Sequence, residues 1–272
     1  MTVNAMNSIS LYGRYLRASL RSQLQYPGSF LLTSVGAFLA TGVDFIALWA
    51  LFARFRQVAG WRFGEVALFY AVIGTAFALA DGFTRGFDVF GPQFVKTGDF
   101  DRLLVRPRST VLQLLGYEVR ATRIGRLAQA LVVWAIAMHL THVAWTWSAW
   151  ATLLFAVAGG FALFAGILVL QATLAFWTVE SLEIANTLTY GGVEAAQYPL
   201  DIYARWFRNF LTFVVPLGCV SYFPVAAVLG RANRTGVAAQ ILPLAPALGF
   251  AFLGVSLWIW RFGVRHYTST GS

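Results

Sequence analysis

Charge is scarce in this chain, and most of the charged residues are basic. Only 11% of its 272 residues are charged, with 20 Lys or Arg against 11 Asp or Glu. A soluble domain carries roughly 25% charged residues. The chain is also 58% hydrophobic, and its mean hydropathy is +0.67. This balance excludes an ordinary soluble domain and indicates an integral membrane protein.

Residues for covalent and metal chemistry are also few. The single cysteine, Cys219, excludes an internal disulfide and a thiolate metal cluster, so we interpret it as a packing residue. His139 and His142 have no acidic or cysteine neighbour in the sequence, and we assign them to the membrane interface. The sole lysine, Lys96, follows Val95, whereas a phosphate-binding G-x-x-x-x-G-K-[ST] loop needs glycine before its lysine. We expect no catalysis, no bound metal and no ATP hydrolysis on this chain.

Long apolar segments make up more than half of the sequence. A membrane-crossing helix needs about 20 mainly apolar residues. Windows of that kind lie near residues 28–53, 63–90, 119–142, 147–177, 208–230 and 240–260. The windows are continuous and do not alternate with period two, which argues against an outer-membrane barrel. The sequence predicts an all-α polytopic membrane bundle with about six transmembrane helices.

The N-terminal segment is basic and lacks the features of a cleaved signal peptide. If it is helical, Arg14, Arg17 and Arg21 share one face, which is typical of a helix in the membrane interface. A simple basic cap before the first span is the alternative interpretation. We divide the chain into residues 1–27 (cytoplasmic tail and interfacial helix), 28–262 (transmembrane domain, with a polar loop at 94–110) and 263–272 (cytoplasmic tail).

Lysine and arginine are distributed unequally between the predicted loops. With the N-terminus inside, 15 of them fall on the cytoplasmic side and 5 on the other side. The smaller group is Arg54, Arg56, Arg62, Arg231 and Arg234. Because positive charge favours the cytoplasmic side, we expect both termini there. The net charge of +9 follows from this bias, so no nucleic-acid partner is expected.

The fifth span is ambiguous. Residues 178–207 carry more charge than a lipid-facing helix tolerates, and prolines interrupt the next apolar window. These residues are Glu180, Glu183, Glu194, Asp201, Pro216 and Pro224. Broken backbone is tolerated in a membrane only where protein or water satisfies it. The fifth span is therefore either 208–230, or about 178–197 with 198–232 forming an external hairpin.

Ionisable residues fall well inside the first two spans. Each charge costs roughly 2.5–3.5 kcal/mol at the bilayer centre unless it is paired or hydrated. Asp81 and Arg85 are four residues apart and can pair on one helix face, with Asp88 nearby at the cytoplasmic rim. Asp44 has no local partner. We hypothesise that Asp44 lines a translocation cavity or bonds across the bundle.

A polar loop at 94–110, FVKTGDFDRLLVRPRST, separates the second and third spans. Gly98 breaks the preceding segment, Asp99 can cap a new helix, and Pro107 ends it. We predict a short amphipathic helix across the cytoplasmic ends of the spans. Its apolar side chains, Phe100, Leu103 and Leu104, are available for docking.

Two motifs and their order resemble a known family. The chain has a basic N-terminal helix and two spans, then G-D-F-D-R-L-L-V-R-P (98–107). After further spans it has Y-P-L-D-I-Y-A-R-W-F-R-N-F-L-T-F-V-V-P (198–216) and Y-F-P-V-A-A-V-L-G (222–230). This order resembles the type-2 ATP-binding-cassette (ABC) transporter permeases of bacteria, over about residues 8–266.

The resemblance implies roles for the matching residues. The 98–107 motif corresponds to a coupling helix that contacts the ATPase subunit through Asp99, Phe100, Asp101, Arg102, Leu103 and Leu104. Residues 14–21 correspond to the family's elbow helix. The second motif belongs in many relatives to a hairpin before the last span. The matching residues are Tyr198, Pro199, Tyr203, Pro216 and Pro224. This match favours the external hairpin.

The resemblance also implies partners and a location. These are a dimer of ATPase subunits that hold ATP and Mg, a second permease chain of the same or a related kind, and the bacterial inner membrane. It implies export of a hydrophobic or amphiphilic compound. Two alternatives stay open at this point, an ion-coupled secondary transporter and a membrane scaffold or lipid-modifying enzyme. If the loop is a coupling helix, Leu103→Asp or Phe100→Asp should uncouple transport while the bundle stays folded.

Overall fold

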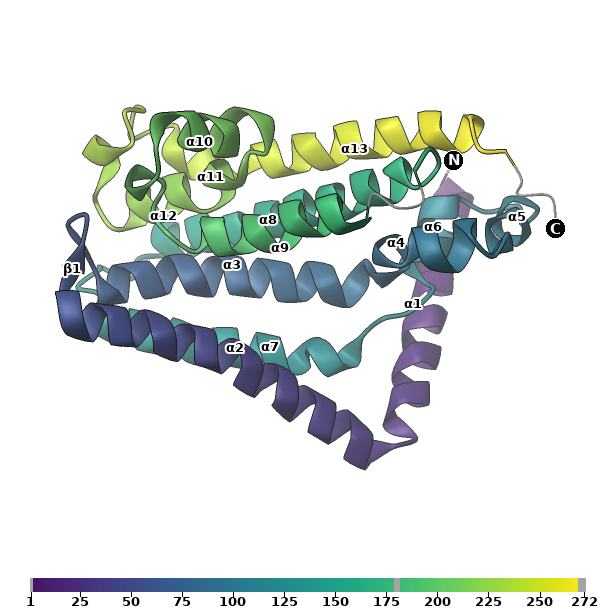
Figure 1. The fold of residues 1–272 in the computed structure, drawn as a ribbon, viewed down its shortest axis with the longest axis horizontal. Coiled ribbons are helices and arrows are strands. Elements are labelled where there is room, and N and C mark those ends of the chain that lie inside the picture. The colour runs from purple at the N-terminus through teal and green to yellow at the C-terminus, as the bar shows by residue number, and fades with distance from the viewer. Residues whose placement is uncertain (1, 179–181, 269–272) are drawn as a thin grey trace.

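The computed structural model describes residues 2–178 and 182–268 and is almost entirely helical. This confirms the predicted all-α membrane bundle. Long helices lie side by side (Figure 1). They are α2 (Pro27–Phe55), α3 (Phe63–Phe83), α7 (Ile124–Leu140), α8 (Trp147–Leu174), α9 (Leu182–Ala196) and α13 (Ala247–Arg265). Helix α1 (Thr2–Leu24) crosses the end of the bundle and meets α2 at Pro27, where the fixed φ of proline suits a first helical position.

Short elements gather at the two ends of the bundle (Figure 1). The end that holds both chain termini, here called the terminal end, carries α4 (Arg85–Asp88), η1 (Gly91–Val95), α5 (Asp99–Leu104), α6 (Thr110–Leu115) and η2 (Ala121–Arg123). The opposite end, here called the hairpin end, carries a two-stranded antiparallel hairpin of β1 (Gln57–Val58) and β2 (Trp61–Arg62). It also carries η3 (Leu200–Ile202), α10 (Arg205–Asn209), η4 (Phe210–Val214), α11 (Leu217–Val220), α12 (Tyr222–Val228), η5 (Ala232–Arg234) and η6 (Leu242–Leu244).

Four helical segments are long and apolar enough to cross a membrane. They are Pro27–Phe55, Phe63–Phe83, Trp147–Leu174 and Leu242–Arg265. Helix α7 is shorter, with 17 residues, but it rises about 25 Å at 1.5 Å per residue. One further candidate is a pair of helical segments, Arg205–Val214 and Leu217–Val228, bent by 75°.

The bent pair does not cross the bundle, because both of its flanks lie at the hairpin end. Before the pair, Asp201 accepts a hydrogen bond of 2.8 Å from Trp61 Nε1. After it, Arg231 forms an ion pair of 2.6 Å with Glu65 at the start of α3. A fifth span at 208–230 is therefore wrong, and the hairpin alternative describes the structure.

Helix α9 takes the fifth position in the bundle and packs against α3 and α8. It is short and carries Glu194, which is why hydropathy alone did not select it. Of the other charged residues expected in this segment, Glu180 lies outside the described residues, and the side chain of Glu183 is not described. With α9 as a span, Arg205 and Arg208 move to the hairpin end, and the split of basic residues becomes 13 to 7.

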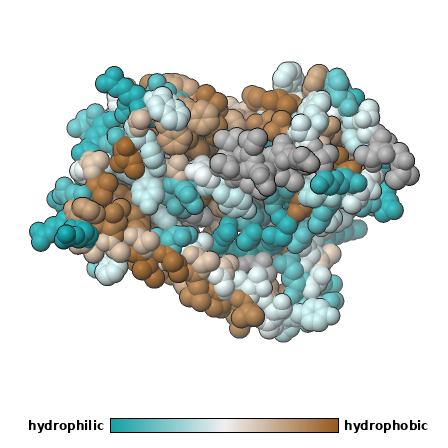
Figure 2. Space-filling view, viewed as in Figure 1, coloured by the Kyte–Doolittle hydropathy of each residue, from teal (hydrophilic) through white to brown (hydrophobic). Residues whose placement is uncertain are grey.

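The middle of α8 lies against the first turn of α13 through a close contact of glycines. A Cβ on Gly249 would lie 2.1 Å from the carbonyl oxygen of Gly159, and a Cβ on Gly159 would lie 2.4 Å from that of Pro246. Small residues at helix interfaces allow such close approach in membrane proteins. By contrast, α2 exposes apolar side chains along its outer face, as expected for contact with lipid (Figure 2).

We predict that Gly249→Val destabilises the bundle and Gly254→Val does not. Both glycines are on α13, but a Cβ at Gly254 meets nothing within 4 Å. Overpacking costs up to about 3 kcal/mol, which corresponds to roughly 10 °C in melting temperature for a chain of this size. Thermal unfolding of both purified variants in the same detergent measures the difference. Equal melting temperatures would show that the glycine contact is not required.

Candidate functional site

The segment after α3 folds into short helices because glycine and proline interrupt it. Gly98 has a left-handed φ of 74° and precedes α5, whose first helical residue is Asp99. The expected Asp99 cap is therefore displaced by one residue. The side chains of Thr97 and Asp99 instead share a hydrogen bond of 3.3 Å. Helix α5 ends before Pro107, as predicted.

A cluster of aromatic rings holds α5 against the bundle. Phe100 is fully buried, with its ring centroid 5.0 Å from Phe90, 5.5 Å from Phe176 and 4.9 Å from Tyr267. Trp260 of α13 packs against Phe90 at 5.0 Å and Phe176 at 5.3 Å. We call these five residues the aromatic anchor. It joins α5 to the terminal ends of α8 and α13.

The six predicted coupling residues therefore face two directions. Phe100 and Leu103 point into the bundle, with exposed fractions of 0% and 8%. Leu104 is 41% exposed, and the next residue, Val105, is 83% exposed. Asp99 and Arg102 form a 2.9 Å ion pair on the outer surface of α5. Their contact with an ATPase stays a prediction.

Burial changes the expectation for two substitutions. Phe100→Asp and Leu103→Asp would each place a carboxylate among apolar side chains, at a cost of several kcal/mol. From the sequence we expected the bundle to stay folded in both variants. Because both side chains are buried, the variants would instead damage the local fold. Asp101, the remaining coupling residue, lies beside the anchor. Burial raises the pKa of the Tyr267 hydroxyl, and a hydrogen bond to Asp101 and the charge of this residue raise it further.

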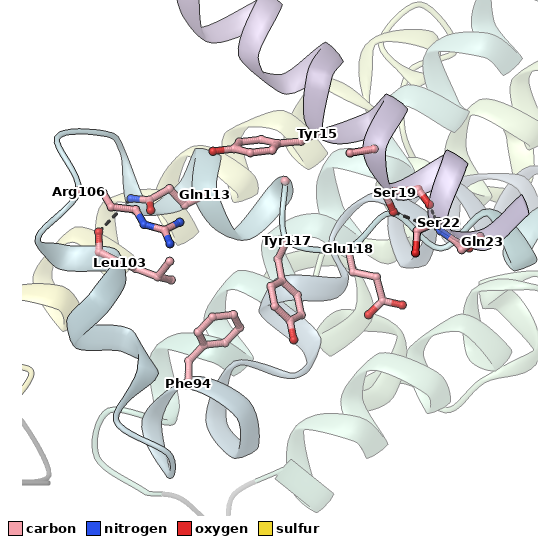
Figure 3. A pocket seen from close by; sticks show the side chains of 12 residues that line it. Tyr15, Ser19, Ser22, Gln23, Phe94, Leu103, Arg106, Gln113, Tyr117 and Glu118 are labelled. Carbon is pink, nitrogen blue, oxygen red and sulfur yellow. Dashed lines mark hydrogen bonds between the residues drawn. The ribbon is translucent and has the colours of Figure 1, made fainter. Parts of the chain in front are cut away.

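Helix α1 clamps the chain between α6 and α7. The Ser19 hydroxyl donates to the carbonyl oxygen of Val119 at 3.0 Å, and Gln23 Oε1 accepts from the backbone of Ala121 at 2.9 Å. Figure 3 shows Ser19 and Gln23 beside a cavity of about 560 Å³ between α1, α5 and α6. On its far side, Gln113 Nε2 donates to Leu103 at 3.0 Å. Sequence reasoning missed these three polar residues, because nothing in their spacing marks their distant partners.

Asp81 lies in a buried ion cluster at the terminal end of α3. Its carboxylate is 2.7 Å from Arg123 and 3.2 Å from Arg126. Arg85 pairs instead with Asp88, so the predicted pairing of Asp81 with Arg85 is wrong. The two arginines are three residues apart at the start of the third span, a spacing that could have identified them.

A second, polar cavity lies between α2, α3, α7 and α9. Its volume is about 200 Å³, and its charged lining residues are Asp44, Arg126 and Glu194. Tyr70, which also lines it, donates to the carbonyl oxygen of Thr41 at 3.0 Å. Figure 2 shows hydrophilic residues in the hollow above the apolar face of α2. Asp44 forms no ion pair with a described residue. We hypothesised that Asp44 either lines a cavity or bonds across the bundle, and the structure has it lining a cavity. The role of Asp44 in transport stays a prediction.

Neither cavity has the composition of a metal centre. The described residues contain no group of three or more His, Cys, Asp or Glu side chains that could hold a metal ion. Cys219 is buried within the bent helix pair, as expected for a packing residue. The first site is a transverse helix, α5, that aromatic rings anchor to the bundle. The second site is a polar cavity inside an apolar bundle.

Comparison with known proteins identifies a transporter family. The family model described as "ABC-2 family transporter protein" matches residues 38–271. No curated protein and no solved structure matches the chain significantly. The matched region contains α3 to α13 and most of α2, and therefore both the polar cavity and the transverse helix α5.

We predict that Asp81→Asn destabilises the fold by about 3 kcal/mol, because it leaves two arginines partly buried and without their shared carboxylate. Asp99→Asn is the matched control. It removes a carboxylate from an exposed pair, which contributes about 0–1 kcal/mol. Thermal unfolding in detergent measures both variants. A melting temperature of Asp81→Asn equal to that of Asp99→Asn would contradict a structural role for the ion cluster.

Proposed function

Because this chain belongs to the ABC-2 family of transporter proteins, we propose that it forms half of an export path driven by a separate ATPase. Its membrane bundle is the permease subunit of such a transporter. The cargo we propose is a hydrophobic or amphiphilic compound. The family alone does not distinguish cargo, so this part rests on the mixed polar and apolar lining of the cavity between α2 and α9.

The anchored helix α5 is the observation that carries the proposal. A helix that transmits force must present one surface to its partner and be fixed to the moving bundle through another. Leu104 and Val105 provide an exposed apolar surface, while Phe100 is held by rings from α8 and α13. A push on the outer surface of α5 would therefore move the ends of two long helices, and not a loop alone.

The ATPase cycle supplies the push in this proposal. Two ATPase subunits bind ATP with Mg and close on one another. This closure displaces the α5 helices of two permease chains, which are identical or related. The displacement changes the access of the shared cavity from inward to outward. No part of the ATP chemistry is assigned to this chain.

The orientation follows from charge. Thirteen of the 20 basic residues lie on the terminal side, which favours placing α1, α5 and both termini in the cytoplasm. We propose the bacterial inner membrane as the location. In this orientation α5 faces a cytoplasmic ATPase, and the bent helix pair faces outward.

The polar cavity is half of a path in this proposal. Asp44 and Glu194 line it, and both side chains are exposed in a single chain. An exposed carboxylate on a membrane helix requires water, protein or a counter-charge around it. A second permease chain against α2 and α9 would provide that enclosure, and the two half-cavities would form one path.

We predict that Val105→Asp abolishes coupling without unfolding the chain. Val105 is 83% exposed, so a carboxylate there leaves the free energy of unfolding nearly unchanged, within about 0.5 kcal/mol. In an apolar interface the same charge would weaken ATPase binding by at least tenfold, and we expect ATPase activity co-purifying with the tagged permease to fall accordingly.

The control for this experiment is Val237→Asp at the hairpin end, where Val237 is also exposed. It makes the same chemical change on the opposite side of the membrane. We expect this variant to retain the co-purifying activity. If Val105→Asp retains it as well, α5 is not the ATPase contact. Uptake driven by an ion gradient in vesicles containing this chain alone would overturn the whole proposal.

We predict that Asp44→Asn reduces ATP-driven transport at least fivefold while ATPase binding is unchanged, because Asp44 lines the cavity and is remote from α5. Transport of hydrophobic fluorescent compounds into inverted membrane vesicles measures the effect. Thr33→Val on the same helix is the control, since Thr33 is exposed and its hydroxyl donates to the carbonyl oxygen of Ser29, one turn earlier in α2. Full transport by both Asp44→Asn and Asp44→Leu would remove Asp44 from the path.

A further inference from the structure

A groove at the terminal end lies between the start of α6 and the last turns of α13, apart from both sites described above. Its volume is about 430 Å³. The residues used in the argument are Ser109, Thr110, Leu257, Trp260, Arg261 and Arg265. The groove thus combines two hydroxyls, two guanidinium groups, an aliphatic side chain and an indole.

The positive charge of the groove is not balanced by the protein. Arg261 and Arg265 are one helical turn apart on α13, and both are exposed. Neither forms an ion pair with any residue in the described part of the chain. Two neighbouring cations that share a groove and lack a carboxylate attract an anionic ligand.

The order of residues along α13 indicates where the apolar and the anionic parts of such a ligand would lie. Leu257 lies toward the middle of the helix, Arg261 one turn closer to the terminal end, and Arg265 one turn further. The helix also exposes apolar side chains such as Val255 and Trp258, so this part of it faces lipid. An apolar wall that leads to a pair of arginines at the membrane rim matches an acyl chain that leads to a phosphate.

The polar wall of the groove offers hydrogen-bond donors at the same level. Trp260 Nε1 donates to Thr110 Oγ1 at 3.2 Å, so the hydroxyl proton of Thr110 is available for an acceptor in the groove. The side chain of Ser109 is exposed at the groove entrance. Donors without a competing acceptor suit phosphate oxygens.

We propose that this groove binds an anionic phospholipid of the leaflet at the terminal end. The phosphate lies between Arg261 and Arg265 and accepts from Thr110, and an acyl chain lies along Leu257. The lipid would touch Trp260, a member of the aromatic anchor that holds Phe100. A bound lipid therefore stabilises the attachment of α5. This site does not depend on the cargo or on the direction of transport.

Photo-labelling in nanodiscs tests the proposal with the full chain. The probe is a phosphatidylglycerol with a diazirine in its acyl chain, compared with a phosphatidylcholine that carries the same chain. Labelled positions are mapped by mass spectrometry. We expect phosphatidylglycerol to label α13 around Leu257 at least fivefold more than phosphatidylcholine does. Arg261→Gln combined with Arg265→Gln should reduce this labelling on the order of tenfold.

Two controls separate a built site from general attraction to the surface. Arg14→Gln combined with Arg17→Gln removes the same charge at the same end from exposed positions of α1. It should leave labelling of α13 within twofold of wild type. Ser109→Trp keeps both arginines of the groove but obstructs its entrance, and should also reduce labelling.

Three results would overturn the proposal. Equal losses in the α1 and α13 double variants would indicate only a general surface potential. Equal labelling by the two lipids would show that the phosphate charge is not recognised. Loss of labelling when millimolar sn-glycerol 3-phosphate is added before irradiation would identify a site for a free phosphate, because a soluble headgroup lacks the acyl chain that contacts Leu257.

Discussion

The contact of Gly159 with Gly249 is the constraint on which the terminal end of the molecule depends. Because neither residue has a side chain, α13 lies directly against α8. With α8 and α13 aligned in this way, Trp260 of α13 lies beside Phe176, which follows α8. Both rings pack against Phe90. Phe100 then has a preformed aromatic cavity to enter. The position of a surface helix of six residues thus depends on backbone packing between the middle of α8 and the first turn of α13.

The ionisable residues inside the bundle fall into two classes. Asp81 is 5% exposed and shares its charge with two arginines from the next span. Such a cluster stabilises one arrangement of α3 and α7, and it leaves one positive charge in excess, with Arg126 also lining the polar cavity. Asp44 and Glu194 have no ion-pair partner in the described residues and line a cavity. Each carboxylate is energetically costly in a membrane unless water, cargo or a second chain surrounds it. In our proposal, these are the residues whose environment changes during transport.

Much of the fold could be predicted from the sequence, because hydropathy and helix breakers act locally. Five of the six windows correspond to helices of the bundle, and Gly98 and Pro107 bracket α5. The fifth span could not be located, because α9 is short and carries Glu194. Which face of α5 is buried could not be predicted from the sequence either. Phe100, Leu103 and Leu104 are all apolar, and only the rings of α8 and α13, distant in sequence, decide that Phe100 is buried and Leu104 is not.

The bent helix pair and α5 are attached to the bundle by different contacts, and this difference bears on how motion could pass between them. At the hairpin end, Trp61 lies between Arg231 and Arg234, at 4.8 and 5.3 Å, and donates to Asp201. These polar contacts join α3 to the bent helix pair. At the terminal end, apolar rings join α5 to α8 and α13. Helix α2 takes part in neither and packs mainly along α7. In our proposal, a displacement of α5 would therefore carry α8 and α13 as one unit, and the bundle would open at the cavity beside α2.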